Sequence, residues 1–211
     1  MNLDTYHSAH LLEAGHKVKS MPLNLSVTSE YAENDDWFEQ LSILSKNPIV
    51  YYGGYLEKRF FYRNESLFGI GRNARNIHLG LDLWLNEGTS IYSPFDAIVK
   101  SYNYNNKVLD YGHTLILEHR LNQEEVFYTL YGHLNNFHTS MEVGLKIKKG
   151  QKIAEIGSPG VNGGWPPHLH LQLIKDLGSY HGDYPGVCTF DELEYYKSNC
   201  PDPTPLFTKY A

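Results

Sequence analysis

Short runs in which apolar and polar residues alternate dominate the chain from Ile77 onward. Every second residue is apolar, which is the spacing of a half-buried strand, and clusters of Gly, Pro and Asn separate the runs. Strands of this kind form antiparallel sheets, so we expect a mainly β fold. The predicted strands are Ile77–Leu85, Ala97–Tyr104, His113–His119, Val126–Leu134 and Leu169–Ile174.

Both ends of the chain depart from this pattern. In Asn34–Lys46 apolar residues recur at helical spacing, which predicts a helix. A second short helix is expected over Phe190–Ser198, begun by Thr189 and Glu192 in a capping-box pattern. The chain is thus expected to comprise an N-terminal accessory region with one helix (1–67), a central β domain (68–178) and a C-terminal helical extension packed on the same domain (179–211).

Charge and cysteine content narrow the functional classes. Lys and Arg number 18 against 24 Asp and Glu, a net charge of −6, whereas proteins that bind nucleic acid need a basic excess. We therefore expect no nucleic-acid partner. No apolar run has the length of a membrane span, and the first thirty residues lack a secretory-signal pattern, so we expect no membrane insertion and a cytoplasmic location. Cys188 and Cys200 are expected to be free thiols.

One predicted strand carries a histidine and an aspartate on a polar face. In the run from 77 to 83 the odd positions are apolar and the even positions are His78, Gly80 and Asp82. A strand places these three residues on one face, and Gly80 has no side chain. We expect the resulting gap to hold an ion that bridges the imidazole and the carboxylate.

The last strand repeats this construction. In the run from 168 to 173, leucines take one face, and His168, His170 and Gln172 take the other. A lone histidine on a strand usually has a structural role, but two such strands together supply two or three imidazoles and a carboxylate. That set matches the three protein ligands of a catalytic zinc site.

The remaining patterned histidines are less informative. His133 follows the strand Val126–Leu130, where a local hydrogen bond is its simplest role. His113 and His119 bracket a β-rich run and cannot form the i, i+4 pair of a helical zinc motif. We expect His113 and His119 either to have a structural role or to contact residues that themselves form a site.

Three sequence motifs, in this order along the chain, resemble those of the lysostaphin/LytM-type zinc metallopeptidase family. They are His78-x-x-x-Asp82, Tyr131-Gly132-His133-Leu134 and Pro167-His168-Leu169-His170. The resemblance covers about Ile70 to Lys175. It implies an all-β fold of the duplicated hybrid motif type, with a groove. It also implies a zinc-dependent endopeptidase acting on a peptide or peptidoglycan-like substrate.

The resemblance further implies site residues. One zinc ion would be held by His78, Asp82 and His170, and His133 and His168 would act in catalysis. A zinc-activated water would attack the peptide carbonyl. No glutamate base is present in a helical motif, so His168, close to His170, is the expected base and His133 the oxyanion donor. The two roles could be exchanged.

Two features depart from the commoner family pattern. Asn162-Gly163-Gly164-Trp165-Pro166-Pro167 precedes the last motif, and Gln172 stands where many members have glutamate. This sequence pattern is similar to that of an intracellular branch of the family.

Two other functions are compatible with the sequence. The first is a non-catalytic, zinc-stabilised module that uses the same groove to bind a peptide or a partner. The second is a carbohydrate- or small-molecule-binding β domain, suggested by the tyrosines with Trp84 and Trp165, although such aromatics usually serve packing. The region 1–67 could also cover the groove, with Asn73, Asn76 or an accessory histidine at the open zinc position.

Overall fold

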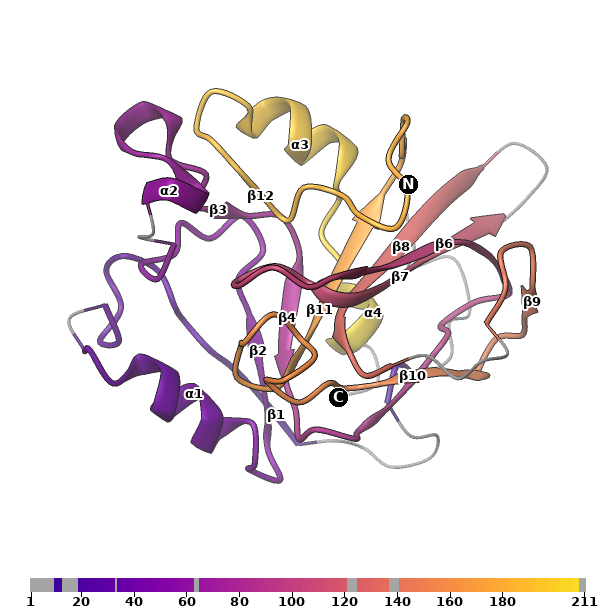
Figure 1. Cartoon of the computed structure of the whole chain (residues 1–211), viewed down its shortest axis with the longest axis horizontal. Helices are drawn as coiled ribbons and strands as arrows, with labels where there is room; N and C mark the ends of the chain where they lie inside the picture. The colour runs from indigo at the N-terminus through magenta and orange to yellow at the C-terminus, as the bar shows by residue number, and fades with distance from the viewer. Residues whose placement is uncertain are drawn as a thin grey trace.

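A computed structural model describes residues 10–12, 19–32, 34–62, 65–120, 125–136 and 141–208. An eight-stranded sheet runs through the centre of the molecule (Figure 1). Its strands, in spatial order, are β1 (Ser20–Pro22), β2 (Val50–Gly53), β4 (Leu81–Trp84), β11 (His168–Ile174), β8 (Val126–Leu134), β7 (Gly112–Arg120), β6 (Ala97–Asn105) and β9 (Lys146–Ile147). Apart from the parallel β1–β2 pair, these neighbours are antiparallel, so the expected mainly β fold is confirmed.

Two small sheets complete the β structure: β5 (Ser90–Tyr92) pairs with β10 (Lys152–Glu155), and β3 (Ile77–His78) pairs with β12 (Val187–Cys188). The single strand predicted for Ile77–Leu85 is wrong, because β3 and β4 are separate strands in different sheets. The Leu79 N–H donates to the Gly186 carbonyl (2.9 Å), away from the large sheet. The other four predicted strands are present, with ends shifted by no more than one residue.

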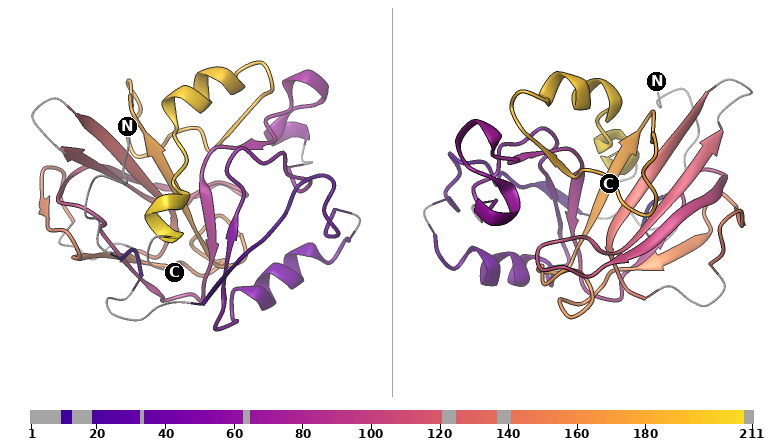
Figure 2. Two further views of the ribbon diagram at one scale, coloured as in Figure 1. Left: turned by 180° about the vertical axis from the view of Figure 1, so that it is seen from behind. Right: turned by 45° about the horizontal axis from the view of Figure 1, so that its top comes forward.

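Short helices lie around the sheet (Figure 2): α1 (Trp37–Leu44), α2 (Glu65–Phe68), η2 (Gly71–Asn73), α3 (Leu193–Asn199) and α4 (Thr204–Thr208). The predicted N-terminal helix is confirmed, because α1 lies inside the expected range. The second predicted helix is present as α3, but it begins at Leu193, three residues later than expected, and its N-cap Glu192 makes no side-chain cap bond. The reciprocal bonds of the expected capping box form just before it: the Thr189 N–H donates to Glu192 Oε2 (3.1 Å) and the Glu192 N–H to Thr189 Oγ1 (3.3 Å). No helix in the described ranges combines the length and the apolar character that a bilayer crossing requires.

The N-terminal region is part of the large sheet. Strand β2 pairs with β4, placing Gly53 opposite Asp82, and β4 therefore lies between β2 and β11. Beyond β2 the chain runs antiparallel to β3, where Lys58 bridges to Ile77. Residues from this region thus lie directly beside the strands that carry the first predicted motif.

Leucines anchor the two central strands from one side. Leu81 and Leu83 of β4 pack in one core cluster with three leucines of β11, Leu169, Leu171 and Leu173. All five side chains are fully or almost fully buried. Because side chains alternate along a strand, this packing turns Asp82 and His170 to the opposite face. The predicted alternation of both strands is therefore confirmed.

Candidate metal centre

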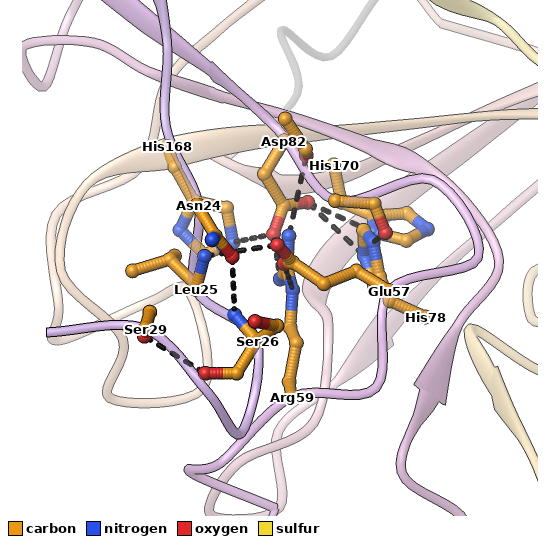
Figure 3. Close-up of polar contacts among 12 residues, drawn as sticks. Asn24, Leu25, Ser26, Ser29, Glu57, Arg59, His78, Asp82, His168 and His170 are labelled. Carbon is orange, nitrogen blue, oxygen red and sulfur yellow. Dashed lines mark hydrogen bonds and ion pairs between the residues drawn. The ribbon is translucent and has the colours of Figure 1, made fainter. Parts of the chain in front are cut away.

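His78, Asp82 and His170 converge, as Figure 3 shows. Asp82 lies opposite His170 in the β4–β11 register, and His78 approaches from β3. His78 Nε2 is 2.9 Å from His170 Nδ1, and Asp82 Oδ1 is 3.3 Å from the first nitrogen and 3.1 Å from the second. The structure therefore brings together the three residues expected to hold the metal.

Backbone and amide partners set the tautomers of both imidazoles. His78 Nδ1 is 3.0 Å from the Gly54 carbonyl, which can only accept, so Nδ1 carries the proton and Nε2 keeps its lone pair. The amide nitrogen of Gln172 donates to the Pro185 carbonyl (3.1 Å), and Gln172 Oε1 lies 3.0 Å from His170 Nε2. His170 Nε2 is then the donor, and its Nδ1 is left bare.

These donor atoms fit zinc. Burial lowers the pKa of His78 to about 3, so this imidazole is neutral at neutral pH. Burial would raise the pKa of Asp82, but the charge of the Arg59 guanidinium outweighs it and holds the pKa well below its ordinary value. Neutral imidazoles and a carboxylate are zinc ligands, and a tetrahedral ion with bonds of about 2.0–2.1 Å needs ligand atoms roughly 3.4 Å apart. The observed separations are close to that value.

The role expected for Gly80 is wrong. A Cβ atom at this position would lie 2.6 Å from His170 Cε1 and 2.7 Å from His170 Nε2. The space beside Gly80 therefore accommodates the imidazole of His170, and an ion would lie on the other side of that ring, at Nδ1.

His133 and His168 lie beside this group, with ring centroids 4.1 Å apart. His168 Nδ1 donates to the Pro166 carbonyl (2.7 Å) and His133 Nδ1 donates to the Asn162 carbonyl (2.9 Å). Burial lowers the pKa of both rings, so both are neutral and both Nε2 atoms can accept a proton. His168 Nε2 is 3.9 Å from Asp82 Oδ2.

The backbone at His133 is strained, with φ at +61°. A left-handed conformation at a non-glycine residue costs on the order of 1 kcal/mol and persists where neighbours impose it. Here the His133 N–H donates to the Tyr111 carbonyl (2.8 Å), and the His133 carbonyl accepts from the Gly157 N–H (2.9 Å). These bonds hold the ring against His168.

A cavity of about 480 Å³ opens onto Asp82, His133, His168 and His170. Aromatic side chains form much of its wall: Phe61, Tyr62, Phe68, Trp84, Tyr111 and Trp165. Trp84 stacks on His168, with centroids 4.5 Å apart and an interplanar angle of 28°. The packing role expected for this tryptophan therefore includes holding a site histidine.

Sequence reasoning missed Arg59, whose Nη1 donates to Asp82 Oδ2. It also missed Glu57, whose Oε2 accepts from Arg59 Nε at 3.0 Å. No pattern marks either residue, because Glu57, Lys58 and Arg59 are three consecutive charged residues before the aromatic run from 60 to 62. Asn73 and Asn76, considered as occupants of the site, do not line this cavity within the described part of the chain.

The other residues considered lie away from the cavity. His113 stacks on Tyr104 (4.1 Å between centroids), while His119 is buried, with Nε2 2.7 Å from Thr129 Oγ1. These contacts agree with the structural role expected for both. Cys188 and Cys200 are buried and free, as predicted.

Comparison with known proteins gives matches to peptidases. Among curated proteins, L-Ala--D-Glu endopeptidase of Bacillus subtilis (strain 168) is 30% identical over 146 residues, 64% of this chain and 43% of that protein. An uncharacterized metalloprotease of Haemophilus influenzae is 30% identical over 96 residues, 46% of this chain and 18% of that protein. The chain thus spans less than half the length of these relatives.

Solved structures with similarity include the catalytic domain of lysostaphin from Staphylococcus simulans, with a TM-score of 0.45 and 20% identity over 76% of this chain and 97% of that one. A zinc containing peptidase from Vibrio cholerae matches with a TM-score of 0.38 and 32% identity, over 46% of this chain and 27% of that one. The model of peptidase family M23, a zinc-dependent family, matches residues 76–181, half of the chain. The resemblance drawn from the motifs is confirmed, and the chain belongs to peptidase family M23.

Proposed function

We propose that this chain is a zinc-dependent endopeptidase that hydrolyses a peptide or amide bond. His78 Nε2, Asp82 Oδ1 and His170 Nδ1 would hold one zinc ion. The convergence of these three atoms beside a cavity carries the proposal. When bound, zinc supplies a Lewis acid that polarises the scissile carbonyl and makes water a stronger nucleophile at neutral pH.

His168 is the proposed general base. Its Nδ1–H is committed to the Pro166 carbonyl, so Nε2 is the atom that takes a proton from the attacking water. Asp82 Oδ2, 3.9 Å away, stabilises the imidazolium that results. The same nitrogen can then return the proton to the leaving amine.

His133 is proposed to stabilise the developing oxyanion. Because its Nδ1–H is committed to the Asn162 carbonyl, His133 can donate to the oxyanion only from Nε2 of a doubly protonated ring. That proton would come from solvent before the attack, so the proton released by the water still goes to His168. The exchanged assignment, with His133 as base, is less favoured. Asp82 Oδ2, 3.9 Å from His168 Nε2, stabilises the protonated form of His168 and so favours it as the base.

The proposed substrate is a peptide or a peptidoglycan-like peptide. A matching relative is an L-Ala--D-Glu endopeptidase, and the aromatic walls of the cavity can flank an extended chain. A cytoplasmic location remains a prediction from the sequence.

The non-catalytic module is less favoured, because a structural zinc site is closed by four protein ligands. Among the described residues the cluster has three, His78, Asp82 and His170, and two of them line the cavity. An open side toward a cavity is typical of catalytic sites.

The test uses the full chain. Metal content is measured after purification, and cleavage of a mixed peptide library and of a peptide containing an L-Ala–D-Glu bond is followed with zinc and with a chelator. We expect about one zinc per chain and cleavage that the chelator abolishes. Binding of peptides without cleavage in the presence of zinc would instead support the module.

A further inference from the structure

Arg59 reaches the metal group from outside the region that the family model matches. Its Nη1 donates to Asp82 Oδ2, its Nε to Glu57 Oε2 (3.0 Å) and its Nη2 to the Gly53 carbonyl (3.2 Å). Figure 3 shows the guanidinium between the two carboxylates. The residue is 2% exposed, so this cation belongs to the interior of the site.

The two oxygens of Asp82 face different partners. Oδ1 faces His78 Nε2 and His170 Nδ1, at 3.3 and 3.1 Å. Oδ2 is bonded to Arg59. Arg59 therefore contacts the oxygen that the two ligand imidazoles, His78 and His170, do not face, and it leaves Oδ1 available to a metal. His168 Nε2 is the other neighbour of Oδ2, at 3.9 Å.

From this division we infer that Arg59 is a positioning residue that keeps Asp82 a one-oxygen ligand of the metal. The inference rests on the proposed zinc site. A carboxylate without a partner on its second oxygen can turn and bind a cation with both oxygens. Such binding would occupy coordination space that the substrate carbonyl needs. Arg59 prevents it by a charge-assisted hydrogen bond.

Arg59 is itself held in place by residues 53–59, which we name the support segment. Glu57 Oε1 accepts from the Leu25 N–H (2.9 Å), which fixes the carboxylate that holds Arg59 Nε. The Arg59 N–H donates to the Asn76 carbonyl (2.9 Å), and any side chain at Gly54 would clash with Arg59 Nη2. The guanidinium therefore has a defined position before any metal binds.

The same segment orients another ligand. The His78 N–H donates to the Glu57 carbonyl (2.9 Å), and His78 Nδ1 donates to the Gly54 carbonyl (3.0 Å). Two of the three ligands thus depend on the support segment, through backbone carbonyls for His78 and through Arg59 for Asp82.

A competing role, in which Arg59 excludes the metal by taking its place on Asp82, predicts a different geometry. A guanidinium that replaced the ion would lie between Oδ1 and the two imidazole nitrogens. Here it lies on Oδ2, and Oδ1 keeps both imidazoles as neighbours.

The test compares Arg59→Met and Arg59→Lys with the wild-type chain, using Arg120→Met as the control. Arg120 does not line the cavity, and its guanidinium donates to Glu118 Oε1 (2.7 Å) at the end of β7. Each full-length protein is loaded with Co²⁺, whose visible absorption weakens as its coordination number rises. Zinc affinity is measured by competition with a chromophoric chelator, and kcat and KM are measured on a cleaved peptide.

We expect Arg59→Met to lower the cobalt absorption and to lower kcat by about 10- to 100-fold, with KM little changed. Zinc affinity should not fall, because removing a cation beside the metal relieves repulsion. Arg59→Lys should retain part of both signals, since it keeps the charge but not the fork. Arg120→Met should match the wild type.

Three results would overturn the inference: an unchanged cobalt spectrum, a raised KM with unchanged kcat, or a large loss of zinc affinity in Arg59→Met. The second would make Arg59 a substrate contact, and the third would make it a general structural support. Should Arg59→Met fail to fold, the same criteria apply to Arg59→Lys. A wild-type chain that binds neither metal would instead overturn the proposed function itself.

Discussion

The imidazole of His170 lies in the space that a side chain on Gly80 would fill. A Cβ atom at Gly80 would be 2.6 Å from His170 Cε1 and 2.7 Å from the carbonyl oxygen of Leu171. The backbone oxygen belongs to a central strand and cannot move aside cheaply. Glycine at this position is therefore a requirement of the ligand geometry.

Gly80→Ala should consequently displace His170 and weaken zinc binding by at least about tenfold, the scale of lost ligand orientation. Chelator competition measures the change. Gly160→Ala is the control, because the nearest atom to its Cβ, Ser158 Oγ, is 3.9 Å away. Equal zinc affinity in the two variants would contradict this account of Gly80.

Removal of a proposed ligand should remove the metal. His170→Ala eliminates Nδ1 from a three-ligand group, so we expect little zinc after dialysis and no measurable turnover. Elemental analysis checks this, with His113→Ala as the control because His113 stacks on Tyr104, away from the cavity. Full zinc content in His170→Ala would show that the ion binds elsewhere.

His168→Ala should separate metal binding from catalysis. The substitution leaves all three proposed ligands in place, so zinc content should remain near that of the wild type. Loss of a general base typically lowers the rate by about 10² to 10⁴-fold. Steady-state kinetics on a cleaved peptide give the rate, and turnover close to the wild type would assign the base to another residue.

Gln172→Glu should tighten zinc binding and lower the stability of the zinc-free protein. An anionic acceptor on His170 Nε2–H makes the ring a stronger ligand, by up to about tenfold in affinity. Without zinc, the new carboxylate would be buried beside the Pro185 carbonyl and Cys200, where burial of charge is unfavourable. Thermal unfolding should show a lower Tm without zinc and a larger gain on adding it, and a Tm unchanged in both states would contradict this.

Stability should depend on pH through His119, which lies away from the metal group. Burial lowers its pKa from 6.5 to about 4. Between these values the unfolded chain binds a proton that the folded chain does not, so stability is complete above pH 6.5 and falls as the pH drops toward 4. The full shift of the His119 pKa corresponds to roughly 3 kcal/mol in the free energy of unfolding.

Urea unfolding of the wild type and of His119→Gln at pH 7.5 and pH 5 measures this contribution. The wild type should lose more stability between the two pH values than the variant. His181→Gln, at an exposed position, is the control and should behave as the wild type. Equal pH dependence in the wild type and His119→Gln would contradict the assignment.

Much of the site could be predicted from local alternation. Because side chains alternate along a strand, the leucines on one face of β11 place His168 and His170 on the other face. Pairing of β4 with β11 then places Asp82 opposite His170. The ordered motifs added His133, which periodicity alone left as a strand-end residue.

The features that could not be predicted depend on contacts between segments that lie far apart in the sequence. The break between β3 and β4 arises because β3 pairs with β12, more than 100 residues later in the chain. Arg59 is likewise one cation in a region without a repeating pattern, and only the pairing of β2 with β4 brings it to Asp82. No spacing within the motifs carries that information.

The pairing of β2 with β4 also bears on how this protein can be dissected. A fragment cut at the family boundary, residue 76, would present β4 as a bare lateral edge whose N–H and C=O groups have lost their neighbours on β2. Such edges invite pairing with other chains. A recombinant fragment trimmed to the residues that the family model matches would therefore expose a strand edge that favours aggregation.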